Sequence, residues 1–204
     1  MVNYLIVLFA ITLIYLVSAE RLIIYIRLIA IQGLLLCGIA IFELTEVTTA
    51  NLLFIAAETL LIKTLLIPYL LSGITKRSGV AKVHRQAIPG FYLLLFSMAG
   101  LLISVIIASS MPNPFINTIF MAIALFTLFT GLLLIVTHKL IISHIIGFLI
   151  IENAVFFFSL AVGNEMPMLI NIGILLDIFV GVLIISFFGL RLKPHTNELT
   201  MLKD

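Results

Sequence analysis

Six ionisable side chains lie in stretches of sequence that are otherwise apolar, and their types are those that carry protons or form ion pairs. They are Arg27, Glu58, Lys63, Glu152 and Asp177, with His144 one turn inside the start of its stretch. A charge at the centre of a membrane-spanning helix costs about 2.5–3.5 kcal/mol on insertion scales, so such residues usually face a bundle interior and mark ion or proton paths. This set favours a proton or ion path, with buried pairs that lock helices together as the alternative.

Two of the acids, Glu152 and Asp177, are expected to meet near the middle of the membrane. At a rise of 1.5 Å per residue, Glu152 lies about 18 Å into its helix from one face and Asp177 about 17 Å into the next helix from the other. Burial disfavours charge on both carboxyl groups, and the first proton to leave makes the second harder to remove. Gly173 and Gly181 share a helix face with Asp177, which would give either room for water or a strip for close helix packing.

Glu58 and Lys63 belong to one apolar stretch but do not form a simple helical ion pair. Five residues at about 100° each place them about 140° apart around the helix axis. Each therefore needs a partner from elsewhere, and Arg27 and Asp177 are the candidates. Lys63 lies about 13 Å from the helix end, too deep to reach the surface easily, which favours a buried relay. Arg27 and His144 lie nearer to helix ends, where a structural or interfacial role is the alternative to proton transfer.

The stretches that carry these residues are long enough to cross a membrane. Of the 204 residues, 63% are hydrophobic and only 10% are charged, a balance typical of polytopic membrane proteins. At about 20 apolar residues per span, the sequence predicts a single all-α transmembrane domain over residues 1–204 with about seven helices, at 2–19, 22–43, 51–72, 89–110, 114–136, 140–162 and 166–190. Pro68 is expected to kink the third helix, because it frees the carbonyl of Thr64.

The basic residues predict the orientation of these helices. If the helices alternate in direction, every Lys and Arg in the connections falls on one side, at Arg21, in the segment 73–88, at Lys139 and in the tail from Arg191. The positive-inside rule then places the N-terminus outside and the C-terminus inside. Removal of the first helix as a signal peptide would reverse this arrangement, so that helix is expected to be retained. Three histidines in the basic segments or the tail are expected to be solvated: His84, His138 and His195.

An internal similarity relates the two ends of the chain. A shift of 118–119 residues places the RLII that begins at Arg21 over the KLII that begins at Lys139, and Glu58 over Asp177. Because four helices separate the copies, both would have the same orientation. Helices 1–3 (residues 1–72) and 5–7 (residues 114–192) are therefore consistent with a parallel duplication, joined by a basic loop and a fourth helix over 73–113.

Composition and motifs exclude several functional classes. The net charge is only +2 and the basic residues lie at membrane edges, which argues against binding of nucleic acid. Nucleotide-binding loops and paired metal-ligand motifs are absent from the sequence. The single cysteine, Cys37, lies in an apolar helix and is expected to be a packing residue. The sequence thus predicts a protein embedded in lipid, with no catalytic centre, metal or cofactor of its own.

The C-terminal third, from about Lys139 to Leu192, resembles the small K subunit of respiratory complex I and the C subunit of multisubunit cation/proton antiporters. The stretch IIGFLIIENAVFFFSLAVG (145–163) resembles the second helix of that subunit, and LLDIFVGVLIISFFGLRL (175–192) resembles its third. The acids depart from the pattern. The K subunit has a Glu where this chain has Leu149, whereas Glu152 lies one turn further along, and Asp177 replaces a Glu.

The whole chain is similar to the hydrogenase-4 component E family, membrane subunits of group 4 nickel–iron hydrogenase and formate hydrogenlyase-type complexes. The resemblance implies a prokaryotic cytoplasmic (inner) membrane and a non-redox subunit. It implies as partners antiporter-like subunits, a quinone-channel-type subunit and peripheral hydrogenase subunits that hold the NiFe centre and iron–sulfur clusters. Glu152 and Asp177 would then serve proton (or sodium) translocation, whereas Glu58 and Lys63 rest on burial alone. The alternatives are a structural subunit linking pump modules and, less favoured, a small-molecule transporter.

Overall fold

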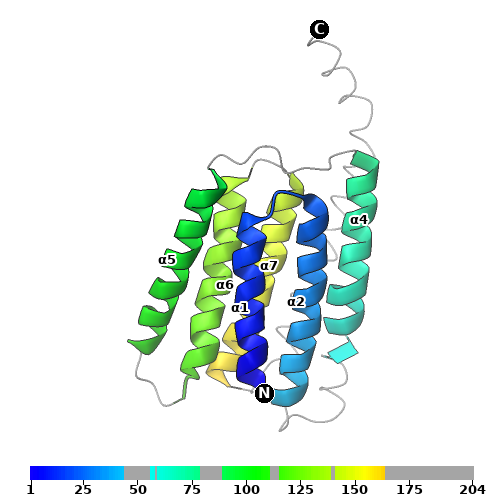
Figure 1. Ribbon diagram of the computed structural model, residues 1–204. Coiled ribbons are helices and arrows are strands. Elements are labelled where there is room, and N and C mark those ends of the chain that lie inside the picture. The colour runs from blue at the N-terminus through cyan, green and yellow to red at the C-terminus, as the bar shows by residue number, and fades with distance from the viewer. Residues whose placement is uncertain (44–55, 58, 79–88, 111–114, 139–140, 164–204) are drawn as a thin grey trace.

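The computed structural model describes residues 1–43, 56–57, 59–78, 89–110, 115–138 and 141–163, which form a bundle of helices (Figure 1). In chain order these are α1 (Val2–Ser18), α2 (Leu22–Glu43), η1 (Thr59–Leu66), α4 (Ile67–Ser78), α5 (Gly90–Ser109), α6 (Thr118–Thr137) and α7 (Ile141–Val162). All are α-helices except η1, which is a π-helix. The helices α4 and α5 lie at opposite edges of the bundle, with α1, α2, α6 and α7 between them (Figure 1).

The predicted all-α membrane character is confirmed for the described residues. The helices α2, α5, α6 and α7 are each long and apolar enough to cross a membrane, whereas α1 and the segment Thr59–Gly73 are apolar but shorter. The last predicted span, 166–190, lies outside the described residues. The number of spans, the positions of the termini and the duplication of 1–72 and 114–192 therefore stay predictions.

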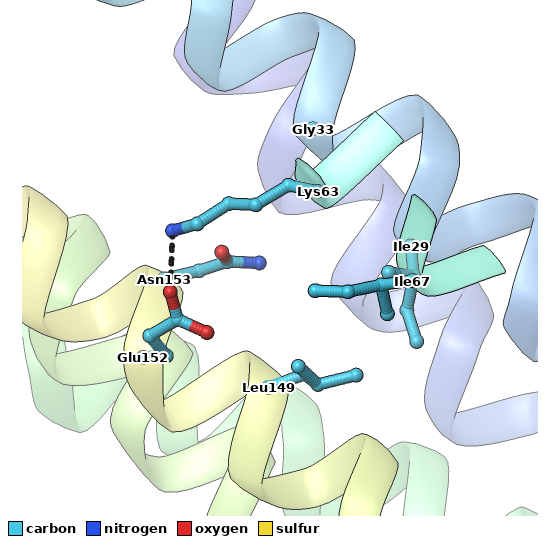
Figure 2. Close-up of a pocket in the computed structure, with 7 residues that line it drawn as sticks. All are labelled: Ile29, Gly33, Lys63, Ile67, Leu149, Glu152 and Asn153. Atoms are coloured by element: carbon cyan, nitrogen blue, oxygen red, sulfur yellow. Dashed lines mark ion pairs between the residues drawn. The ribbon is translucent and has the colours of Figure 1, made fainter. Parts of the chain in front are cut away.

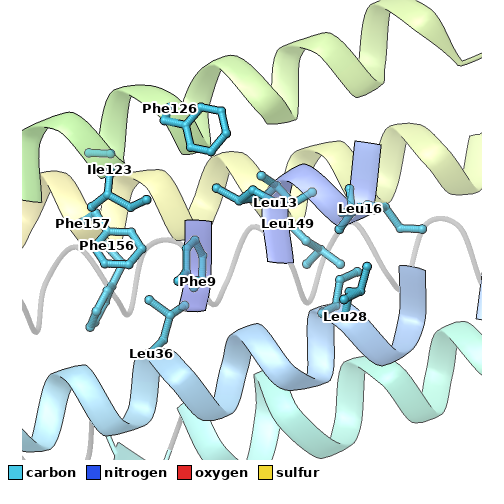
Figure 3. Packing of buried hydrophobic residues seen from close by; sticks show 14 of the residues in the cluster. Phe9, Leu13, Leu16, Leu28, Leu36, Ile123, Phe126, Leu149, Phe156 and Phe157 are labelled. Carbon is cyan, nitrogen blue, oxygen red and sulfur yellow. The ribbon is translucent and has the colours of Figure 1, made fainter. Parts of the chain in front are cut away.

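Aromatic and aliphatic side chains fill the centre of the bundle, where α1, α2, α6 and α7 meet (Figure 3). The rings of Phe9 and Phe157 are fully buried and meet edge to face, with their centroids 4.8 Å apart. Phe126 and Leu36 are also fully buried in this core. Lipid chains are as apolar as these side chains, so the burial of apolar surface does little to hold helices together in a membrane. Close packing and polar contacts between helices stabilise such a bundle instead.

A pair of glycines brings α6 and α7 together. A Cβ atom added to Gly131 would lie 2.8 Å from the carbonyl oxygen of Gly147, and a Cβ added to Gly147 would lie 2.9 Å from the carbonyl oxygen of Gly131. Only residues without a side chain fit at this approach. The crossing fixes α7, the helix that carries Glu152, against α6.

The helix that carries Lys63 is wound more widely than an α-helix. The π-helix η1 has eight residues and ends just before Pro68, the second residue of α4. Proline has no N–H to donate, so the regular hydrogen-bond ladder is interrupted at this point. The hydroxyl of Thr64 donates to the carbonyl of Thr59, five residues earlier, at 3.1 Å. The helix is thus irregular as a π-helical segment ahead of Pro68, a form frequent at functional sites, whereas the kink expected at Pro68 stays a prediction.

Candidate functional site: a buried ion pair between η1 and α7

Lys63 and Glu152 form an ion pair in the interior of the bundle. The Nζ atom of Lys63 lies 2.8 Å from Oε1 of Glu152, with side chains 9% and 3% exposed respectively (Figure 2). Oε1 has no aligned hydrogen bond among the described residues, so the short contact is an ion pair whose angles fall outside hydrogen-bond geometry. Because an unpaired buried charge costs several kcal/mol, each residue makes the burial of the other tolerable.

A small cavity lies beside the ion pair. It is lined by Ile29, Gly33, Lys63, Ile67, Leu149, Glu152 and Asn153 (Figure 2). The cavity volume is about 10 Å³, close to the minimum of about 10–15 Å³ that holds one water. Lys63, Glu152 and Asn153 would supply the polar partners that a buried water needs. The cavity thus suits one water next to the charges.

Beside the pair, a chain of side-chain hydrogen bonds joins α7 to α2 and α1. Asn153, the neighbour of Glu152 on α7, donates from Nδ2 to Oε1 of Gln32 at 3.3 Å. Gln32 is fully buried and donates from Nε2 to the hydroxyl of Thr12 at 3.1 Å. The hydroxyl of Thr12 in turn donates to the carbonyl of Phe9 at 2.6 Å. Three helices are therefore joined by polar contacts near the middle of α2 and α7.

The structure brings together some of the predicted site residues and separates others. It pairs Lys63 with Glu152, a partner that the sequence did not suggest; the candidates for Glu58 and Lys63 were Arg27 and Asp177. Arg27 is exposed on α2, and His144 is half-buried in the first turns of α7. Glu58 and Asp177 lie outside the described residues, and so does any contact between Glu152 and Asp177.

Gln32 belongs to the site, although sequence reasoning passed it over. It is an uncharged amide in the middle of the apolar stretch 22–43, and a search restricted to ionisable residues misses such a side chain. A lone amide at mid-span is a usable signal, because a buried polar group inside a membrane requires a partner.

The expectation that His138 is solvated is wrong. This residue follows the last turn of α6 and is 2% exposed. Its Nε2 atom lies 3.2 Å from the hydroxyl of Tyr25 on α2. Its Nδ1 atom lies 3.0 Å from the hydroxyl of Thr137 and 3.2 Å from the carbonyl of Leu134. The adjacent Lys139 suggested a basic loop, but the imidazole lies against the Tyr25 side chain of α2 and the last turn of its own helix.

The hydrogen bonds around His138 assign its tautomer. The hydroxyl of Thr137 donates its proton to the carbonyl of Leu133 at 2.6 Å, so its oxygen accepts from Nδ1–H. In the neutral imidazole, Nε2 then accepts the hydroxyl proton of Tyr25. Burial lowers the pKa of His138, the hydrogen bond to the Leu134 carbonyl opposes this, and nearby His144 adds to the lowering.

Metal binding finds no support in the described part of the chain, where no three His, Cys, Asp or Glu side chains are grouped to hold an ion. Cys37 is buried in α2, with its Sγ atom 3.8 Å from the carbonyl of Ala56. The polar chemistry described here is therefore that of the Lys63–Glu152 pair, its amide neighbours and the His138 cluster.

Fold and site together define a helical membrane protein with an ion pair buried in its bundle. Comparison of the chain with protein-family models, curated proteins and solved structures finds no match. The resemblance to the hydrogenase-4 component E family therefore rests on the sequence motifs alone.

Proposed function

We propose that this chain is a membrane-arm subunit of a complex I-like, hydrogenase-4-type complex. In this role its buried charges contribute to the translocation of protons (or sodium ions) coupled to redox chemistry in partner subunits. The observation that carries the proposal is the Lys63–Glu152 pair, 2.8 Å apart beside a cavity of about one water. Ionisable residues within membrane helices usually mark ion or proton pathways.

The pair can change its charge state without moving a net charge into the membrane. Transfer of one proton from the Lys63 ammonium breaks an N–H bond and forms an O–H bond on Glu152, which leaves a neutral amine and a neutral carboxylic acid. A charge that arrives on a neighbouring group shifts this balance. In the proposed mechanism Asp177 and Glu58 supply such charges, and redox events in partner subunits drive them.

The setting of the subunit follows from the same proposal. The N-terminus lies outside and the C-terminus inside a prokaryotic cytoplasmic membrane, as the basic connections indicate. Antiporter-like, quinone-channel-type and peripheral hydrogenase subunits surround the chain, and they hold the NiFe centre and the iron–sulfur clusters. The chain itself is a non-redox subunit.

The test is redox-driven ion movement in vesicles that hold the intact complex. Glu152→Gln and Asp177→Asn are expected to abolish most of the ion movement while hydrogenase turnover continues. Glu20→Gln is the matched control, since Glu20 is an exposed carboxyl in the connection between α1 and α2. Full ion movement in both acid variants, with the complex assembled, would show that the relay is wrong.

A structural subunit is the second candidate, and the amide contacts favour it. The Asn153–Gln32 and Gln32–Thr12 bonds join three helices without any titratable group. If the charges only lock helices, Glu152→Gln loosens the complex and loses ion movement and hydrogenase turnover together. A small-molecule transporter, the third candidate, predicts instead a lone monomer from native membranes that takes up substrate.

A further inference from the structure

We infer that two adjacent residues of α2, Gln32 and Gly33, position the two halves of the Lys63–Glu152 pair. Gly33 faces the π-helix that carries Lys63, and Gln32 holds the residue next to Glu152. Two adjacent residues near the middle of α2 therefore contact both the helix that carries Lys63 and the helix that carries Glu152. The inference rests on the proposed function only for its effect on ion movement, because the geometry of the pair is independent of that function.

Gly33 lets η1 approach α2 closely at Lys63. A Cβ atom added to Gly33 would lie 2.6 Å from the hydroxyl oxygen of Thr64, 3.1 Å from the backbone nitrogen of Thr64 and 3.2 Å from the backbone carbonyl carbon of Lys63. Two of these atoms belong to the backbone and cannot rotate away. A methyl group at this position must push η1 outward, and Lys63 moves with it. Gly33 also lines the cavity beside the pair (Figure 2).

Gln32 fixes the other half of the pair through Asn153. Its carboxamide accepts from Asn153 and donates to Thr12, so it is held on both sides. Asn153 is the next residue after Glu152 and lines the same cavity. The bond between Gln32 and Asn153 therefore sets the rotation and height of α7 relative to α2, and with them the place of the Glu152 carboxyl.

The position of the pair matters because the distance between its charges decides how strongly Lys63 favours the ionised carboxyl. In a medium of low dielectric constant a shift of a fraction of an ångström in this distance changes the proton affinity of both groups. A residue that holds the distance constant therefore sets the pH range in which the pair exchanges protons.

The test reads the protonation state of Glu152 in the intact complex by infrared difference spectroscopy. The carbonyl stretch of the protonated carboxyl is assigned to Glu152 by its loss in Glu152→Gln. As the pH is lowered, the band appears when Glu152 becomes protonated. In Gly33→Ala and in Gln32→Met it is expected to appear at a pH about one unit higher than in wild type, because Lys63 stabilises the ionised carboxyl less well. In a protein that already carries Asn153→Leu, Gln32→Met is expected to cause no further shift of the band, since the hydrogen bond between Gln32 and Asn153 is already lost.

Two matched glycine substitutions control for the added methyl group. Among the described residues, Gly38→Ala on the same helix meets only the end of the Leu5 side chain at 3.3 Å, and Gly73→Ala on α4 meets no atom within 4 Å. Both are expected to leave the Glu152 band unchanged. Gln32→Met decides the question if Gly33→Ala does not fold.

The outcomes separate this inference from the proposed function. An unchanged Glu152 band in Gly33→Ala and Gln32→Met overturns the positioning role, even if Glu152→Gln abolishes ion movement and so leaves the proposed function standing. A shifted band with unchanged ion movement supports the positioning role and counts against the proposed function. A shift in both, with the same change in pH dependence, supports both.

Discussion

Lys63 on the π-helix η1 and Glu152 near the middle of α7 lie with opposite charges 2.8 Å apart in the interior of the bundle. Their chain segments are distant in sequence, and α2 packs against both of them. Each residue alone would place an uncompensated charge in a medium that solvates it poorly. Together they form a site in which each charge compensates the other.

The first prediction concerns the energy of this pair. Lys63→Met is expected to lower the free energy of unfolding by about 3 kcal/mol, since it leaves the Glu152 carboxyl buried without its partner. Combining it with Glu152→Gln is expected to cost at least about 1 kcal/mol less than the sum of the two single changes, because both charges are then gone. Denaturant titration of the purified protein in micelles measures these differences. Strict additivity of the two changes would mean that the residues are not coupled.

The second prediction concerns the place of the acid on α7. Leu149 and Glu152 line the same cavity, one turn apart. The proposed resemblance to the K subunit would place the acid at the position that Leu149 has in this chain. The exchange Leu149→Glu with Glu152→Leu is therefore expected to keep a carboxyl within reach of Lys63. It should recover much of the unfolding free energy and ion movement that Glu152→Leu alone removes.

The single variants are the comparisons for this double exchange. Leu149→Glu with Glu152 retained is expected to destabilise the protein, because two like charges then compete for one ammonium group. The double exchange could also show no more unfolding free energy or ion movement than Glu152→Leu alone. In that case a carboxyl at position 149 does not reach Lys63, and the two positions are not equivalent.

The third prediction is a pH dependence of stability that comes from His138. Its pKa is lowered in the folded protein, chiefly by burial, whereas in the unfolded chain it has the ordinary value of about 6.5. Well above this pH the imidazole is neutral in both the folded and the unfolded state, and His138 does not lower the free energy of unfolding. As the pH falls below about 6.5 towards the folded pKa, the unfolded state binds the proton first, and the stability decreases.

The unfolding free energy of wild type and His138→Gln, measured from about pH 8 to pH 5, tests this slope. The variant is expected to be less stable at pH 8 and to show a flatter decrease towards pH 5. Tyr25→Phe serves as the comparison, since it removes the hydrogen bond to Nε2 but keeps the burial. An equally steep decrease in His138→Gln would assign the pH dependence to other groups.

The fourth prediction concerns the approach of α6 to α7. Gly131→Ala is expected to cost about 1–3 kcal/mol of unfolding free energy, because its methyl group would lie 2.7 Å from the Ile151 side chain and 2.8 Å from a backbone oxygen. Gly73→Ala meets no atom of the described residues within 4 Å and is expected to be neutral or to stabilise by up to about 1 kcal/mol. Thermal unfolding in micelles compares the two. Equal effects at both positions would contradict the close approach.

Several features of the molecule are properties of single helices, and the sequence determined them. Apolar stretches of about 20 residues predicted α2, α5, α6 and α7, and the described helix bounds lie close to the predicted ones. The same pattern showed that Lys63 and Glu152 lie deep within such stretches. Depth follows from a count along one chain segment at a fixed rise per residue, so it needs no knowledge of the neighbouring helices.

The partners were decided by the tertiary structure, because hydropathy says nothing about how one helix is rotated against another. The sequence offered Arg27 and Asp177 as partners for Glu58 and Lys63, and the rotation of η1 and α7 brings Glu152 to Lys63. His138, expected in water, is covered by Tyr25 from a helix distant in sequence. Residue types and depths along each helix set which charges must be buried, whereas close approaches such as that at Gly33 decide which of them meet.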